Sequence, residues 1–227
     1  MKLLYEGKTK NVFELDNERC LLEFKDDVTG ENGRIDPGAN TVYGKLEGKG
    51  KQALKMSTYY FELLHQQGIP TQYLKTELEK NHMVVKKAEP FGKGLEVVCR
   101  FKAYGSFLRR YALYTKEFQP LDALIEITLK DDLRGDPLIN DDALIQLGLV
   151  NPPELKSIKE MAGKIAKIIK DDLAESGLDL IDIKFEFGKA GGEIILIDDI
   201  SGDNMRVFKD GHQVSPLELS DMVGKNK

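Results

Sequence analysis

The sequence predicts an α+β protein with two lobes, a β-rich N-terminal lobe that holds an antiparallel sheet and a C-terminal α/β lobe. The order of the predicted elements is the first reason, because it runs β-rich, helix, β-rich, helix and β-hairpin. This is not the regular alternation of strand and helix that makes a parallel doubly wound sheet. The second reason is the length of 227 residues, which allows two small domains as well as one large one. We expect the lobes to span residues 1–88 and 89–227, with a ligand cleft between them.

Short apolar runs predict the strands of the N-terminal lobe. The runs LLY, NVFEL and CLLEF are separated by EGKTK and DNER, which have the composition of hairpin connections. The stretch DDVTGENGRIDPGAN, rich in Gly, Asp and Asn, predicts a loop. Two further strands are expected around the turn EKN at 79–81.

Helical spacing of apolar residues predicts two main helices. The first runs from about residue 50 to residue 67, with apolar residues from Met56 to Leu64 on one face, and Gly68 ends it. The second is long: Pro152 and Pro153 open it, and it should end near Gly177. A helical turn at 107–111 and a short helix at 141–147 complete the set, and strands are expected in EVVCRFKAY, IEITLK, LIDIKFEFG and GEIILID.

Composition excludes several classes of function. A formal net charge of −5 argues against a general nucleic-acid binder, which needs a basic surface. No apolar stretch is long enough for a signal peptide or a membrane span. Only two cysteines, Cys20 and Cys99, are present, and nothing indicates a disulfide, so a reducing cytoplasm is the expected location.

The first chemical motif is YEGKTKNVFEL, which places Gly7, Lys8 and Lys10 in the turn between two strands. A glycine lets the backbone approach a ligand, and two lysines at i and i+2 can hold phosphate oxygens as point charges. The alternative is an ordinary solvated turn. The motif is neither a P-loop nor a dinucleotide-binding GxGxxG.

The second motif is LIDIKFEFG, in which Asp182, Lys184 and Glu186 share one face of a strand. The next strand, GEIILID, is apolar on both faces and runs into Asp198 and Asp199. If the neighbouring charged face is covered as well, its charges need partners, and a site for Mg²⁺ and phosphate is the interpretation we test. The alternative is a half-exposed strand with its polar face in water.

The register of this hairpin decides which aspartate accompanies Glu186. An even-length loop at KAGG pairs Glu186 with Ile195 and puts Asp199 on its face, whereas an odd-length loop puts Asp198 there. The sequence leaves both open.

The third motif is EVVCRFKAYGSFLRRY. Arg100 and Lys102 share a strand face, and Gly105 and Ser106 precede a helical turn. Backbone N–H groups, a hydroxyl and neighbouring cations suit an anion. The alternative is an ordinary N-cap serine on a basic helix.

Five stretches, YEGKTK, CRFKAYGS, GDPLIN, IDIKFEFG and IDDISGDNMR, resemble in this order the motifs of the phosphoribosylaminoimidazole-succinocarboxamide synthase (SAICAR synthetase) family. The resemblance implies an ATP-dependent ligase of de novo purine biosynthesis. Such an enzyme joins L-aspartate to the carboxylate of CAIR through an acyl phosphate, giving SAICAR, ADP and phosphate, with Mg²⁺ as cofactor. It also implies a kinase/ATP-grasp-like fold, with ATP bound by the N-terminal lobe and with the substrate and metal sites in the C-terminal lobe, and it allows a homodimer.

The resemblance also implies roles for residues of this sequence. ATP would be bound by Lys8, Lys10, Val84, Lys86, Ala88 and Glu186, and CAIR by Arg100, Ser106, Lys184 and Arg206. Glu186 and Asp198 would hold the metal, and Lys184 and Arg206 would act in catalysis. The chain departs from the family pattern at Phe101, Lys102, Tyr104 and Ser201-Gly202-Asp203, and no role is carried over to residues 33–44.

Two rival functions use similar residues. A small-molecule or protein kinase also needs a Gly-Lys hairpin and a strand-end aspartate, but no H-R-D-x-x-x-x-N or D-F-G stretch occurs. A non-catalytic nucleotide sensor would keep the fold and bind without turnover.

Overall fold

A computed structural model describes residues 1–31, 33–36, 39 and 41–223 of the chain. The chain forms two compact units. The first comprises Met1–Ala88, Asp199–Asn204 and the part from Val214 onward, and the second comprises Glu89–Asp198 and Met205–Gln213. The sequence analysis assigned 199–204 and the segment from residue 214 onward to the C-terminal lobe. In the structure, residues 199–204 and 214–223 belong to the first compact unit.

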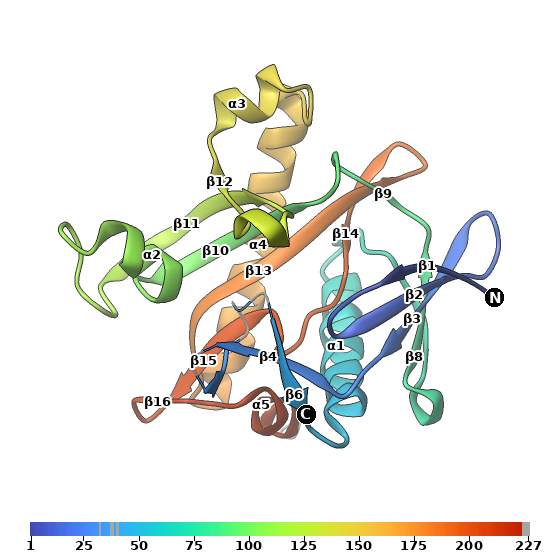
Figure 1. The fold of residues 1–227 in the computed structure, drawn as a ribbon, viewed down its shortest axis with the longest axis horizontal. Coiled ribbons are helices and arrows are strands. Elements are labelled where there is room, and N and C mark those ends of the chain that lie inside the picture. Colours follow the sequence, from blue (N-terminus) through green and yellow to red (C-terminus); the bar gives the residue numbers. More distant parts are fainter. Residues whose placement is uncertain (32, 37–38, 40, 224–227) are drawn as a thin grey trace. The chain divides into compact units, whose positions relative to one another are not determined.

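The first unit is built on an antiparallel sheet of order β1-β2-β3-β8-β7 (Figure 1). Its strands are β1 (Lys2–Glu6), β2 (Lys10–Glu14), β3 (Arg19–Phe24), β7 (Tyr73–Glu77) and β8 (His82–Lys86), with the 3-10 helix η1 (Leu78–Lys80) between β7 and β8. Helix α1 (Lys49–Gln66) contacts β3 and β7, and α5 (Pro216–Met222) packs on α1. The three expected N-terminal strands and the first long helix are confirmed.

The expected loop at 26–40 is wrong in part. β4 (Asp27–Glu31) pairs with both β5 (Arg34–Ile35) and β6 (Val42–Lys45) in a small antiparallel sheet. These strands are two to five residues long, and β4 and β6 contain glycine, so they show little of the apolar alternation by which a strand is recognised.

The second unit is built on a larger antiparallel sheet of order β12-β11-β10-β13-β15-β16, with β9 and β14 also paired to β13. Its strands are β9 (Glu89–Pro90), β10 (Leu95–Lys102), β11 (Pro120–Leu129), β12 (Leu138–Ile139), β13 (Asp179–Ala190), β14 (Glu193–Ile197), β15 (Met205–Lys209) and β16 (His212–Gln213). Its helices are α2 (Gly105–Tyr111), the 3-10 helix η2 (Asp132–Arg134), α3 (Asp141–Gln146) and α4 (Pro152–Glu175). β15, β16 and α5 were not predicted.

Helix α4 covers one face of this sheet, against β10, β11 and β13. A capping box starts it, because the Asn151 side chain accepts from the Glu154 N–H while the Glu154 carboxylate accepts from the Asn151 N–H. Proline stands in the first turn, and Gly177, at φ 69°, follows the end of the helix. The core between helix and sheet is fully apolar and includes Ile158, Ile165, Ile169, Val97, Cys99, Ile181, Ile183 and Phe185. The opposite face of the sheet is therefore the one left for charged residues.

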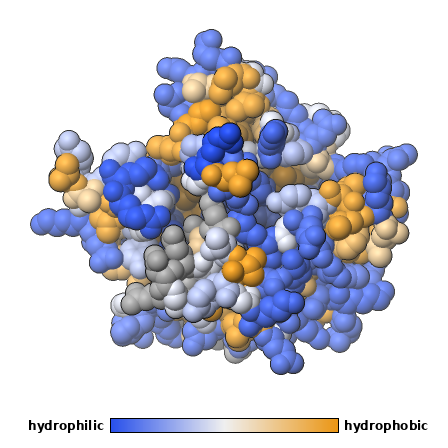
Figure 2. All heavy atoms as spheres, viewed as in Figure 1, coloured by the Kyte–Doolittle hydropathy of each residue, from blue (hydrophilic) through white to orange (hydrophobic). Residues whose placement is uncertain are grey.

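Apolar side chains also reach the surface of the second unit. Figure 2 shows a group of them at the top of the view, where Figure 1 places α3 and β12. A recess of about 1110 Å³ lies there between α2, β11, β12 and α3, and its lining includes Phe107, Tyr111, Leu124 and Leu138.

Candidate functional site

The charged face of β13 is covered rather than solvated. Asp182, Lys184 and Glu186 alternate with the apolar residues that face α4, as the sequence predicts. Asp182 is 3% exposed and Glu186 is 6% exposed. The alternative of a half-exposed strand with its polar face in water is thus wrong. Charges this deeply buried need partners, and the adjacent strands supply them.

Two arginines flank Asp182 on the neighbouring strands. The register pairs Arg100 of β10 with Asp182 and pairs Asp182 with Arg206 of β15, so the three side chains form one row across the sheet. Arg100 Nη1 donates to Asp182 Oδ2 at 2.8 Å. Arg206 Nη1 donates to Oδ1 at 3.1 Å and to Oδ2 at 2.9 Å. One carboxylate therefore fixes two guanidinium groups.

Arg100 has two further partners in the same group. Its Nε donates to Glu126 Oε2 at 2.6 Å, and its Nη2 donates to Ser106 Oγ at 3.0 Å. Gly105 adopts φ 53°, and a Cβ atom there would lie 3.0–3.1 Å from the Arg206 guanidinium, so a glycine is needed. Arg100 and Ser106, which belong to the third motif, come together in space with Arg206, which only the resemblance added to them.

Glu186 is held by two lysines. Lys130, the residue after β11, approaches Glu186 Oε1 at 2.7 Å, and Lys184 approaches the same oxygen at 3.6 Å and Glu96 Oε1 at 3.0 Å. Burial lowers the pKa of Lys184, but Glu96, Glu186 and Asp198 outweigh it and hold that pKa well above its ordinary value. The pKa of Lys130 is raised as well, because the carboxylates of Glu186 and Asp198 outweigh the effect of burial, which lowers it. Both lysines are therefore cationic at neutral pH.

Lys130 was missed from the sequence, although a signal existed. Glu126, Thr128 and Lys130 recur at every second position of IEITLK, just as Asp182, Lys184 and Glu186 do in β13. Two strands with the same polar alternation are expected to share a face when they belong to one sheet.

The hairpin after β13 has an even-length loop, one of the two cases that the sequence left open. Its loop is Gly191-Gly192, with φ of 58° and 85°, as a two-residue turn requires. Lys189 and Ala190 extend the strand, so Glu186 pairs with Ile197. The expected pairing with Ile195 is therefore wrong by two residues.

Register alone would now put Asp199 on the face of Glu186, yet the alternation ends before it. β14 stops at Ile197, and Asp198 adopts φ 66°, a left-handed conformation that aspartate tolerates better than most residues. Asp198 acts electrostatically on Lys130 and Lys184, the two lysines around Glu186. Asp199 is instead buried in the first unit, paired with Lys10.

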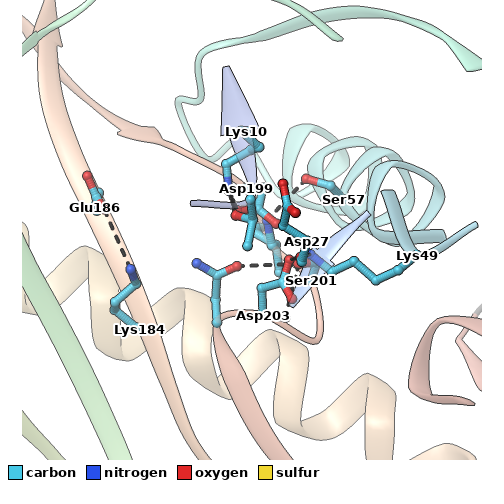
Figure 3. A network of polar contacts seen from close by, with 12 residues as sticks. Lys10, Asp27, Lys49, Ser57, Lys184, Glu186, Asp199, Ser201 and Asp203 are labelled. Atoms are coloured by element: carbon cyan, nitrogen blue, oxygen red, sulfur yellow. Dashed lines mark hydrogen bonds and ion pairs between the residues drawn. The ribbon is translucent and has the colours of Figure 1, made fainter. Parts of the chain in front are cut away.

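The first unit contains a network of ion pairs around the segment 199–204 (Figure 3). Lys10, from the first residue of β2, pairs with Asp199, and Lys49, from the first residue of α1, pairs with Asp203. Lys25 pairs with Asp27 at 3.2 Å and donates to the Gly7 carbonyl at 3.0 Å, which ties the Gly-Lys turn to the same network. Lys49 carries no predicted role from the sequence, because a lone lysine before a helical pattern gives no signal.

The residues expected to contact adenine lie on and after β8. Val84 is buried and pairs with β3 on one side and β7 on the other, so its backbone is inside the sheet. The Lys86 N–H donates to the Gln72 carbonyl at 2.7 Å. Ala88 lies beyond the end of β8, and Lys8 lies in the bend between β1 and β2.

The large recess of the second unit shares only Glu126 with these groups. Among the described residues, no three or more His, Cys, Asp and Glu side chains are grouped so that they could hold a metal ion unaided. In the same part of the chain, no helix has the length and apolar character needed to cross a membrane.

Comparison with known proteins decides the family. A family model described as SAICAR synthetase matches residues 3–221. A phosphoribosylaminoimidazole-succinocarboxamide synthase from Clostridium tetani is 50% identical over 225 residues, which cover 98% of this chain and 99% of that protein. The chain belongs to the SAICAR synthetase family. A second relative of the same name, from Methanocaldococcus jannaschii, is 36% identical over 206 residues, with coverage of 90% and 81%.

Solved structures of the SAICAR synthetase family share the fold. A SAICAR synthetase (Type-2) in complex with ADP is 34% identical, with a TM-score of 0.82 over 92% of this chain and 86% of that chain. The SAICAR synthetase (Type-1) of Pyrococcus horikoshii OT3 is 32% identical, with a TM-score of 0.79 over 90% and 86%.

The SAICAR synthetase family catalyses the ATP-dependent ligation of L-aspartate to CAIR in purine biosynthesis. The chain is accordingly an ATP-dependent carbon–nitrogen ligase with small-molecule substrates. The family resemblance carried by the five motifs is confirmed, and neither the kinase nor the non-catalytic sensor is the function of this family.

Proposed function

We propose that the charged face of the second unit binds CAIR and the metal, and that the Gly-Lys turn of the first unit binds the phosphates of ATP. The observation that carries this proposal is that one sheet face presents both the Arg100–Asp182–Arg206 row and the Glu186–Lys184 group. In this proposal the protein is two-lobed and kinase/ATP-grasp-like, with residues 1–88 as the ATP-binding lobe. It acts in the cytoplasm, and a homodimer is allowed.

The arginine row suits the phosphate of CAIR. Two guanidinium groups and the Ser106 hydroxyl offer directed donors, and a guanidinium matches a phosphate with two parallel hydrogen bonds. Asp182 occupies part of each guanidinium, and Glu126 accepts from the Nε–H of Arg100, so these carboxylates hold the two arginines in place. Lys102 lies outside this set, because it pairs with Asp179.

Glu186 and Asp198 fit a magnesium ion. Both are hard oxygen donors that act on the same two lysines, and Mg²⁺ takes one or two carboxylates and completes its shell with water and phosphate oxygens. When bound, the ion would neutralise charge on the ATP phosphates. Lys8 and Lys10 would hold these phosphates. The backbone at Ala88, beyond the end of β8, would lie against adenine, because the Val84 backbone is enclosed by β3 and β7 and the Lys86 N–H donates to Gln72.

The chemistry then needs positioning and charge neutralisation more than acid–base groups. A carboxylate oxygen of CAIR attacks the γ-phosphorus of ATP, the bond to ADP breaks, and an acyl phosphate forms. The aspartate amine attacks its carbonyl carbon, phosphate leaves, and the amine loses a proton. Because the pKa of Lys184 is held well above its ordinary value, Lys184 stays protonated and neutralises the transferring phosphoryl group or the CAIR carboxylate. Arg206 holds CAIR in line for both steps.

The metal assignment is tested with Asp198→Asn. We expect magnesium-dependent ADP binding, measured by calorimetry, to weaken by about tenfold or more, because Mg²⁺ binds largely through its carboxylates. Asp210→Asn is the matched control, since Asp210 also has positive φ, at 50°, but is exposed in a turn. Asn relieves backbone strain equally at both positions. If Asp198→Asn binds ADP with an unchanged magnesium dependence, the metal assignment is wrong.

A further inference from the structure

Lys49 is a buried, positively charged side chain at the N-terminus of a helix, where a positive charge is unfavourable. It is 2% exposed and is the first residue of α1, where the helix dipole presents a partial positive charge. The first turn of α1 contains no acidic residue, and the Asp26 carboxylate accepts from the Gly48 and Gly50 N–H groups rather than pairing with Lys49. An apolar residue of similar volume would often serve the stability of such a buried position as well as an ion pair does. Its presence therefore points to a role other than stability.

The partners of Lys49 connect two distant parts of the chain. Its Nζ donates to the Asp27 carbonyl of β4 at 3.0 Å and pairs with the carboxylate of Asp203. Burial raises the pKa of Asp203, Lys49 opposes that rise, and nearby Asp199 adds to it. Lys49 is thus the main cation that opposes the effect of burial on Asp203 in the segment 199–204.

Segment 199–204 is fixed to the first unit at three points (Figure 3). Lys10 pairs with Asp199, and the Ile200 N–H donates to Ser57 Oγ of α1 at 3.1 Å. The Lys49–Asp203 pair is the third point. Inside the segment, the Asp203 N–H donates to Ser201 Oγ at 3.2 Å, which closes it into a compact turn.

The charges of this segment and its two lysines balance. Lys10 and Lys49 match Asp199 and Asp203, and all four interact, since both Asp199 and Lys10 act on the titration of Asp203. Removing the charge of Lys49 would leave a net negative charge beside Lys10. An anionic ligand at Lys10 would then be repelled, and the segment would lose its third attachment.

We propose that Lys49 is a positioning residue for the nucleotide site: through Asp203 it fixes segment 199–204, so that Asp199 holds the Lys10 ammonium in place for phosphate. This inference rests on the proposed function, because only that function assigns the ATP phosphates to Lys10 and the metal to Asp198.

The test compares Lys49→Met with Lys51→Met. Lys51 lies two residues further along α1, but its side chain is 39% exposed and pairs with Glu79 at 3.1 Å on the surface. We expect Lys49→Met to weaken magnesium-dependent ADP binding by at least about tenfold, as misplacement of a ligand-holding group does. CAIR binding without nucleotide should stay within about twofold, because the arginine row belongs to the second unit, and Lys51→Met should leave both affinities within about twofold.

Two more variants distinguish a failure of the positioning role of Lys49 from a failure of the proposed nucleotide site. Asp203→Asn removes the same ion pair with little change in volume, so it serves if Lys49→Met does not fold. ADP affinity within about twofold of the wild type in either folded variant would overturn the role of Lys49. Lys10→Met tests the nucleotide site itself. If Lys10→Met weakens ADP binding and Lys49→Met does not, only the positioning role fails; if Lys10→Met binds ADP normally, the proposed nucleotide site fails.

Discussion

Asp182→Asn should destabilise the protein far more than the same substitution three residues earlier on β13. Asp182 accepts three hydrogen bonds from Arg100 and Arg206, and its side chain is 4% exposed. Breaking a buried ion pair costs about 3–5 kcal/mol, because it leaves a charge without a partner in a site with little water. Asparagine can still accept one hydrogen bond, so we expect about 3 kcal/mol.

Asp179→Asn is the matched control. Asp179 pairs with Lys102, but their side chains are 44% and 31% exposed. An exposed pair contributes about 0–1 kcal/mol. Urea denaturation followed by circular dichroism measures both variants. With a slope of about 1–3 kcal/mol per molar urea, the midpoint of Asp182→Asn should fall by about 1–3 M, while that of Asp179→Asn should move by no more than about a third as much. Equal shifts for the two variants would refute the buried arginine row.

Two further predictions concern packing and thiol chemistry. A Cβ atom on Gly202 would lie 2.5 Å from Pro216 Cα, so Gly202→Ala should cost about 1–3 kcal/mol through overpacking. Gly163→Ala, inside α4, would place a Cβ atom with no atom from outside its own stretch of helix within 4 Å, so it should stabilise by about 0.5–1 kcal/mol. Urea midpoints that move in the same direction for the two variants would contradict these predictions. Burial raises the pKa of Cys99 to about 12 and also raises the pKa of Cys20. A thiol reagent at pH 8 should therefore label neither cysteine quickly until urea is added, and rapid stoichiometric labelling of the native chain would show that the thiols are accessible.

Long, periodic elements could be predicted from the sequence because their signals are local. The residues around α4 supply a cap, a proline start and an apolar stripe, and the structure places the helix where these residues predict it. The alternation in LIDIKFEFG likewise separates the face toward α4 from the charged face. The strands β4 to β6 were not predicted, because segments of two to five residues show too little periodicity.

The site was less predictable because its geometry depends on contacts distant in sequence. Arg100 and Arg206 meet only because β10 and β15 flank β13, which no local pattern reveals. The hairpin register alone would place Asp199, and not Asp198, on the face of Glu186. The positive φ of Asp198 ends the strand alternation before Asp199, and no local sequence pattern predicts that φ. The ion pair of Lys49 could not be predicted from a local pattern, because its partner Asp203 lies 154 residues away in the sequence.

An omission assay on the purified wild-type chain tests most directly whether the chain is an ATP-dependent ligase. ATP, CAIR and L-aspartate are supplied together and then with each one left out, and ADP and SAICAR are both quantified. Equal amounts of ADP and SAICAR are expected when all three substrates are present, and no SAICAR is expected when any one is missing. Sustained ADP release without aspartate or without CAIR, or binding of all three with no product, would contradict the assignment of this chain as an ATP-dependent ligase.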